Sequence, residues 1–255
     1  MKPKLSVLLL CSIAAIPGSL AYADGTSVVV TPSVVSQYMF RGVRLGGPAF
    51  EPQVEVDSGD FVIGVWANTP LKDKVPGQSD PEIDPYGSYT LKINDSLNVA
   101  PGFTWYNYPR ANTNNGFYKS TFEPNLALNY TVSGVRFTPK VYYDVVLKGP
   151  TYELTVAYAI PLKDAGTELD FTATGGTYII KDAIKGVDPK VKNWGDYYLF
   201  GVAAPFQITK ESKLILGFAY TKGTGNYFKQ DADPRVPNSA AVGRGVVTLS
   251  YVYTF

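Results

Sequence analysis

Apolar and polar residues alternate with a period of two along most of the chain. In the last stretch, residues 243–255, one phase holds Val247, Leu249, Tyr251, Tyr253 and Phe255, and the other holds mainly small and hydroxylated residues. Such alternation predicts a β-strand. An edge strand with so aromatic a face would aggregate in an ordinary globular protein. The stretch therefore predicts a strand that pairs on both sides and turns its apolar face to lipid.

The same pattern, interrupted by turn residues, predicts about twelve strands. Short turns alternate with longer polar loops, as periplasmic turns and extracellular loops do in outer-membrane barrels. The sequence predicts an all-β protein, a transmembrane antiparallel up-and-down β-barrel, in which residues 26–40 pair with residues 246–255. The predicted strands are 26–42, 51–57, 61–68, 84–93, 97–108, 119–130, 135–146, 151–161, 167–180, 196–208, 213–222 and 243–255.

Charged residues occupy the phase opposite to the apolar one, so they would face a wet interior. The candidate pore-lining residues are Arg41, Glu55, Asp57, Trp66, Lys92, Glu123, Arg136, Lys140, Asp144, Glu153, Glu168, Asp170 and Arg244. They would either form a mixed-charge lining that selects small polar solutes or pair with one another to hold the wall together.

Two of these residues have alternatives of their own. Arg41 is either a cation that contacts solutes or the partner of Glu55 or Asp57 on the neighbouring strand, and the ion pair is favoured. Trp66 is unusual on a wet wall. It would either pack under an inward-folded loop or contact a sugar-like ligand.

The first 23 residues read as a secretory signal peptide. Lys2 and Lys4 precede an apolar run, and Ala21 and Ala23 form an A-x-A cleavage site. Residues 24–255 would then form a single barrel domain without cysteine, because Cys11 lies in the signal. Removing both lysines leaves 21 basic against 22 acidic residues, a net charge of about −1 that gives no indication of nucleic-acid binding.

The chain contains no histidine. This removes the usual general base and the commonest metal ligand, so we expect no enzyme activity, no catalytic residues, no cofactor and no metal site. The acidic loop at Asp231 and Asp233 has no EF-hand spacing and carries no weight as a calcium site.

Three segments carry a family resemblance: Ser36–Gly42 (SQYMFRG), Gly64–Asn68 (GVWAN) and Glu82–Tyr86 (EIDPY). This set, with its Tyr-x-Phe-Arg-Gly core, resembles the TorF-like porins, bacterial outer-membrane proteins of unknown function. Gln37 stands where that family usually has an acidic residue, and the following loop differs. The resemblance covers the first third of the chain and the terminal strand, and it implies a porin without naming a solute.

The sequence thus predicts a porin of a Gram-negative outer membrane that allows passive or weakly selective diffusion of small polar solutes or ions. The alternative is a closed barrel that acts through its loops or its periplasmic face as an adhesin or envelope scaffold. The expected partners are membrane lipids, lipopolysaccharide and the barrel-assembly machinery, which would read Tyr251, Tyr253 and Phe255 in the closing strand as an assembly signal.

Overall fold

The computed structural model describes residues 25–73, 81–111, 118–180, 193–225 and 243–255. The predicted signal peptide and the Asp231–Asp233 loop lie outside these residues. Within them, no helix is long and apolar enough to cross a membrane.

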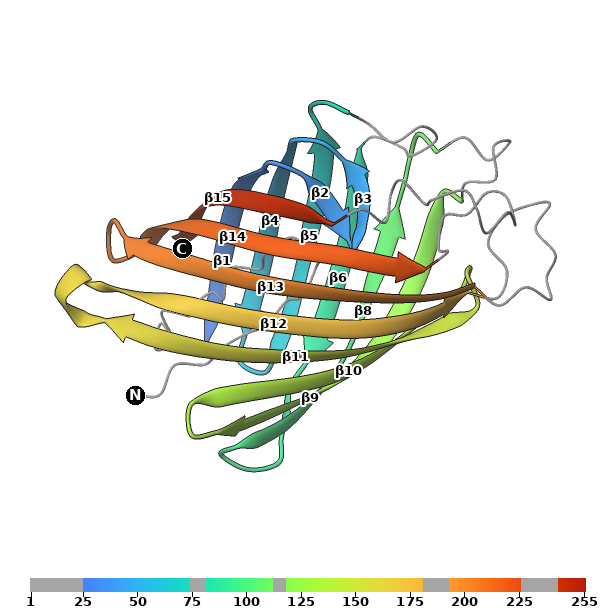
Figure 1. Ribbon diagram of the computed structural model, residues 1–255. Coiled ribbons are helices and arrows are strands. Elements are labelled where there is room, and N and C mark those ends of the chain that lie inside the picture. Colours follow the sequence, from blue (N-terminus) through green and yellow to red (C-terminus); the bar gives the residue numbers. More distant parts are fainter. Residues whose placement is uncertain (1–24, 74–80, 112–117, 181–192, 226–242) are drawn as a thin grey trace.

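Twelve antiparallel strands close into a barrel (Figure 1), which confirms the predicted fold class. A short strand, β7 (Leu91–Lys92), continues β6 after a break at Thr90 and pairs with β8. A short 3₁₀ turn, η2 (Lys163–Ala165), joins β11 to β12. The wall strands are β1 (Thr26–Val35), β4 (Ala49–Ser58), β5 (Phe61–Pro70), β6 (Glu82–Tyr89), β8 (Leu97–Asn107), β9 (Ser120–Val132), β10 (Val135–Asp144), β11 (Gly149–Leu162), β12 (Thr167–Ile180), β13 (Asn193–Gln207), β14 (Ser212–Gly225) and β15 (Arg244–Thr254).

The barrel closes where the sequence predicts, between the first and last strands. The ladder runs from Val29 opposite Thr254 to Val35 opposite Thr248. The Phe255 N–H also donates to the Val28 carbonyl at 2.9 Å, which places the end of the chain at the short-turn rim. The predicted pairing of the closing strand with the first strand is confirmed.

The wall presents an apolar outer face and a polar inner face. In β15, Val247, Leu249 and Tyr251 are 40–49% exposed, whereas Thr248 and Ser250 are each 4% exposed. The same division holds on the other wall strands, so a continuous apolar surface surrounds the barrel. Such a surface is stable next to lipid and unstable in water.

The first strand is shorter than the sequence predicts, and this part of the prediction is wrong. β1 ends at Val35, and residues 38–46 form a separate hairpin of β2 (Tyr38–Phe40) and β3 (Val43–Gly46) that folds inside the barrel (Figure 1). The chain bends at Ser36, whose N–H donates to the Val247 carbonyl and whose Oγ accepts the Val247 N–H. These bonds end the ladder to β15.

The interior hairpin is held at its root by an apolar core. Tyr38, Met39, Val43 and Leu45 are buried together with Trp66 and neighbouring wall residues. The Tyr38 and Trp66 rings lie 5.9 Å apart. Trp66 therefore packs under an inward-folded loop, one of its two predicted roles.

Candidate functional site

The lumen is lined by the inward phase of the wall strands, and acidic side chains predominate in it. The described inward-facing acids are Glu51, Glu55, Asp57, Glu82, Asp84, Glu123, Asp144, Glu153, Glu168 and Asp170. The described inward-facing bases are Arg41, from the hairpin, and Arg136, Lys140, Lys213 and Arg244, from the wall.

All but one of the charged residues predicted to line the pore lie in this set, and the uncharged Trp66 packs against the hairpin. Lys92 is exposed at the turn between β7 and β8, where its Nζ pairs with Asp95 at 3.0 Å. The prediction that Lys92 lines the lumen is wrong, because the strand ends there and its side chain reaches solvent.

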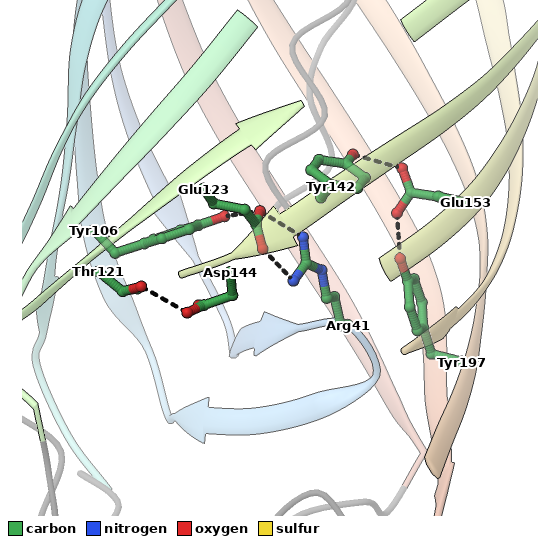
Figure 2. Close-up of polar contacts among 8 residues, drawn as sticks. All are labelled: Arg41, Tyr106, Thr121, Glu123, Tyr142, Asp144, Glu153 and Tyr197. Atoms are coloured by element: carbon green, nitrogen blue, oxygen red, sulfur yellow. Dashed lines mark hydrogen bonds and ion pairs between the residues drawn. The ribbon is translucent and has the colours of Figure 1, made fainter. Parts of the chain in front are cut away.

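Arg41 lies at the tip of the β2–β3 hairpin and reaches across the lumen to β9 (Figure 2). Its Nη1 and Nη2 donate to the two carboxylate oxygens of Glu123 at 2.9 and 2.7 Å. The Glu123 side chain is 1% exposed, and Tyr106 donates to the same carboxylate at 3.1 Å. Two parallel bonds from a guanidinium to a carboxylate form one of the stronger polar contacts in proteins. Arg41 thus pairs with Glu123, and the predicted pairing with Glu55 or Asp57 is wrong.

Aromatic rings enclose the guanidinium of Arg41. Its Cζ lies 4.7 Å from the centroids of both the Phe40 and the Tyr142 rings. Burial by itself lowers the pKa of Arg41, but the Glu123 carboxylate raises it, and the pKa lies well above its ordinary value. Arg41 therefore carries a permanent positive charge into an acid-rich part of the lumen.

A second carboxylate bridges three strands beside this pair. Glu153, on β11, accepts hydrogen bonds from the hydroxyls of Tyr142, on β10, at 2.9 Å and Tyr197, on β13, at 2.5 Å (Figure 2). Gly176 makes room for the Tyr197 ring, since a Cβ there would overlap it. These contacts fix the inner wall around the tip of the hairpin.

Asp144 ends β10 near the same level. It accepts a hydrogen bond from the Thr121 hydroxyl at 2.6 Å (Figure 2). It also accepts hydrogen bonds from the N–H groups of Val146 and Leu147 at 2.9 and 2.8 Å. Its carboxylate therefore stabilises the connection between β10 and β11, a structural role.

The root of the hairpin contacts a separate polar group on β4, β5 and β6. Tyr38 donates to Glu82 at 2.5 Å, and Asn68 donates to Glu51 at 2.9 Å. Burial, with the Glu82 carboxylate next in effect, raises the pKa of Tyr38 well above its ordinary value, so this hydroxyl remains a donor. The hairpin is thus bound to the wall at both its root and its tip.

A cavity of about 70 Å³ lies beside the tip of the hairpin. Its walls include Tyr106, Tyr142 and Glu153 from the polar network, together with Asn125 and Lys140. The Lys140 Nζ lies 4.6 Å from the Tyr142 ring centroid. This volume is enough for a few water molecules and has polar groups that can bind them.

The half of the lumen near the short turns has a different composition. Asp170 lies there with Glu168, and Arg136 and Lys213 provide electrostatic partners for Asp170. Lys213 is absent from the predicted lining. In β14 it lies on the inward face, and the exposed Leu216 and Phe218 lie on the outward face of the same strand. That alternation could have identified it.

Other lining residues give weaker signals in the sequence. Tyr106, Tyr142 and Tyr197 face the lumen, whereas aromatic residues of a barrel are first expected at its lipid interfaces.

Among the described residues, no group of three or more histidine, cysteine, aspartate or glutamate side chains is arranged to hold a metal ion.

The fold belongs to the class of outer-membrane β-barrels. It is similar to the NanC porin (13% identity, covering 89% of this chain and 98% of NanC, TM-score 0.54). It is also similar to the KdgM porin in complex with disordered oligogalacturonate (12%, 90% and 99%, 0.51) and to LpxR from Salmonella typhimurium (9%, 90% and 100%, 0.51). At these identities the likeness shows the fold alone.

The chain belongs to the Gcw_chp family, described as bacterial proteins of unknown function, whose model matches residues 22–177. A search of curated proteins finds no match. The narrower resemblance to TorF-like porins stays a prediction.

Proposed function

We propose that this protein is an outer-membrane porin through which ions and small polar solutes diffuse. The observation that carries the proposal is the division of the closed wall into an apolar outer face and a charged inner face. The wall strands have 8–15 residues, and strands of about 9–11 residues suffice to cross a membrane when tilted. A closed barrel also leaves no unpaired strand edge in lipid.

The excess of inward acids supports a preference for cations. Ten acidic and five basic side chains face the lumen among the described residues, and Arg41 neutralises Glu123. Rings of carboxylates lower the energy of cations in a pore and raise that of anions. NanC and KdgM are named as porins, which supports the channel role. The oligogalacturonate in the KdgM structure is an acidic sugar polymer, and an acid-rich lumen gives no support for such a solute here.

A closed barrel that acts as an adhesin or envelope scaffold is the second candidate. The observation in its favour is the hairpin, whose root fills part of the lumen with apolar side chains. Under this alternative, the ion pairs and tyrosine–carboxylate bonds would only stabilise the wall.

The proposal includes the delivery of the protein to its membrane. A signal peptide cleaved after Ala23 would direct export, and the barrel-assembly machinery would bind Tyr251, Tyr253 and Phe255. Tyr253 and Phe255 place their rings 4.6 Å apart at the short-turn end of β15, where membrane lipids would surround the barrel, and lipopolysaccharide would surround the opposite, long-loop end. The absence of histidine argues against a Ser-His-acid hydrolase.

Single-channel recording in planar bilayers tests the function. We expect discrete conductance steps and, across a salt gradient, a reversal potential that indicates cation preference. The control is the same preparation unfolded by heat before addition. A folded barrel that gives no steps in any salt would contradict the porin and favour the closed barrel.

A further inference from the structure

We propose that the β2–β3 hairpin is the constriction of this channel, and that Arg41 sets its size limit by fixing the hairpin tip to Glu123. The inference rests on the proposed porin function and assigns the element that determines which solutes pass. The hairpin lies inside the barrel (Figure 1). Its tip contacts the wall on two sides.

The first contact of the tip is polar. Arg41 forms two bonds to Glu123 on β9 and lies against the Tyr142 ring of β10 (Figure 2). Glu123 is held in turn by Tyr106, which also packs edge-on against Phe40 with ring centroids 5.8 Å apart. The wall at β8, β9 and β10 therefore supplies both a carboxylate and aromatic rings that bind the guanidinium.

The second contact is between backbones. Gly42 approaches Gly223 of β14 so closely that a Cβ on Gly42 would overlap the Gly223 backbone. In the sheet, β14 is separated from β9 by four strands, β10 to β13. The hairpin tip thus touches two distant parts of the wall and narrows the lumen between them.

The turn itself does not require arginine. Arg41 and Gly42 are the two loop residues between Phe40 and Val43, with φ of 46° and 75°. Positive φ at both positions is typical of a type I′ turn, which favours Asn-Gly or Asp-Gly. The left-handed conformation is unfavourable for a residue such as arginine, and its bonds to Glu123 offset that cost. The side chain of Arg41 thus contributes through its contact across the lumen.

The root and tip differ in how firmly they are held. The root is packed among Trp66, Tyr86 and Val246 in the apolar core, whereas the tip touches the Gly223 backbone and is otherwise fixed by the ion pair and the rings around it. Removing the pair should therefore free the tip and leave the root in place. The lumen would widen at this level.

Two substitutions separate this size-limiting role from a simple charge effect. Arg41→Asn suits the turn but removes the pair, and Glu123→Gln removes it from the other side. If the pair fixes the constriction, both variants raise single-channel conductance, by about two-fold or more, and admit larger neutral solutes. Their reversal potentials shift in opposite directions, Arg41→Asn toward cations and Glu123→Gln toward anions.

Two further variants complete the experiment. The double variant Arg41→Glu with Glu123→Arg exchanges the two charges and keeps the ion pair. It should restore the wild-type size limit. Arg44→Asn is the matched control, because Arg44 lies in the same hairpin and its partners, Gln37 at 2.5 Å and the exposed Asp73 at 3.4 Å, lie at the root of the hairpin and beyond it, away from the tip. It should leave the size limit unchanged.

Opposite shifts in reversal potential without any change in conductance or size limit would overturn the proposal, because Arg41 would then act only as a charge. If the single variants do not fold, replacing residues 37–47 by Asn-Gly decides instead. Val35 and Ala49 are opposite each other in the β1–β4 ladder, so a short turn can join these strands. This variant should conduct several-fold more than the wild type, and equal conductance would overturn the proposal.

The outcomes also separate this inference from the porin function. A conducting wild type with an unchanged size limit in every variant refutes the constriction alone. A silent wild type with a conducting hairpin-replacement variant refutes passive diffusion and supports the hairpin as the obstruction. Silence from both refutes both.

Discussion

A charge placed on the outer face of the barrel should lower its stability, and the size of the loss should depend on where along the strand the residue lies. Leu249 lies in the middle of β15, is 47% exposed, and stands opposite Val34 of β1 and Leu216 of β14. If this face contacts the hydrocarbon of a membrane, an arginine here is surrounded by lipid. We therefore choose Leu249→Arg as the perturbation.

The expected cost is about 2–4 kcal/mol, the range for arginine on the lipid face of a barrel near the bilayer midplane, compared with about 0–1 kcal/mol near the interfaces. Leu249 is the sixth residue of an eleven-residue strand, so the larger range applies. The control is Ser88→Arg, which adds the same charge at a half-buried residue that lines the interior cavity. Because it faces the polar interior and not lipid, it should change stability by less than about 1 kcal/mol.

The assay is reversible guanidinium unfolding in phospholipid vesicles, followed by tryptophan fluorescence. We expect the midpoint of Leu249→Arg to fall well below that of the wild type, with Ser88→Arg close to the wild type. Equal losses for the two variants would refute the orientation of the wall, because a charge would then cost the same on either face.

Two further predictions concern the inner wall. Gly176→Ala should destabilise the barrel by roughly 1–3 kcal/mol, because the added Cβ overlaps the Tyr197 ring; a lower thermal midpoint checks this, and an unchanged one contradicts it. Arg136→Ala and Lys140→Ala should each shift the reversal potential toward cations, because each removes an inward positive charge; identical reversal potentials would show that neither charge acts on permeating ions.

The wall could be predicted closely from the sequence because strand alternation and turn residues are local signals. β12 spans Thr167–Ile180, the range predicted, and most other wall strands begin and end within three residues of their predicted limits. Turns such as Ser133-Gly134, with φ of 49° and 80°, mark the ends of strands. The polarity of each strand follows from the same alternation.

The hairpin could not be predicted in this way. Apolar residues continue past Val35 into Tyr38, Met39 and Phe40, so the pattern extends the first strand without a break. The bend at Ser36 and the inward fold depend on contacts with distant strands. The pair that fixes the tip joins residues 82 positions apart, and several acids on the inner face could equally have been its partner on charge alone. Only the closed barrel determines that Glu123 lies within reach of Arg41.

The most direct test of the central claim is the flux of solutes through the purified, folded protein. Liposomes that contain it are diluted into isosmotic solutions of neutral polar solutes of increasing size, and swelling is followed by light scattering. The porin account predicts swelling with the smallest solutes and a sharp decline as size increases, because the hairpin narrows the lumen. No swelling above that of protein-free liposomes with any solute would contradict the account.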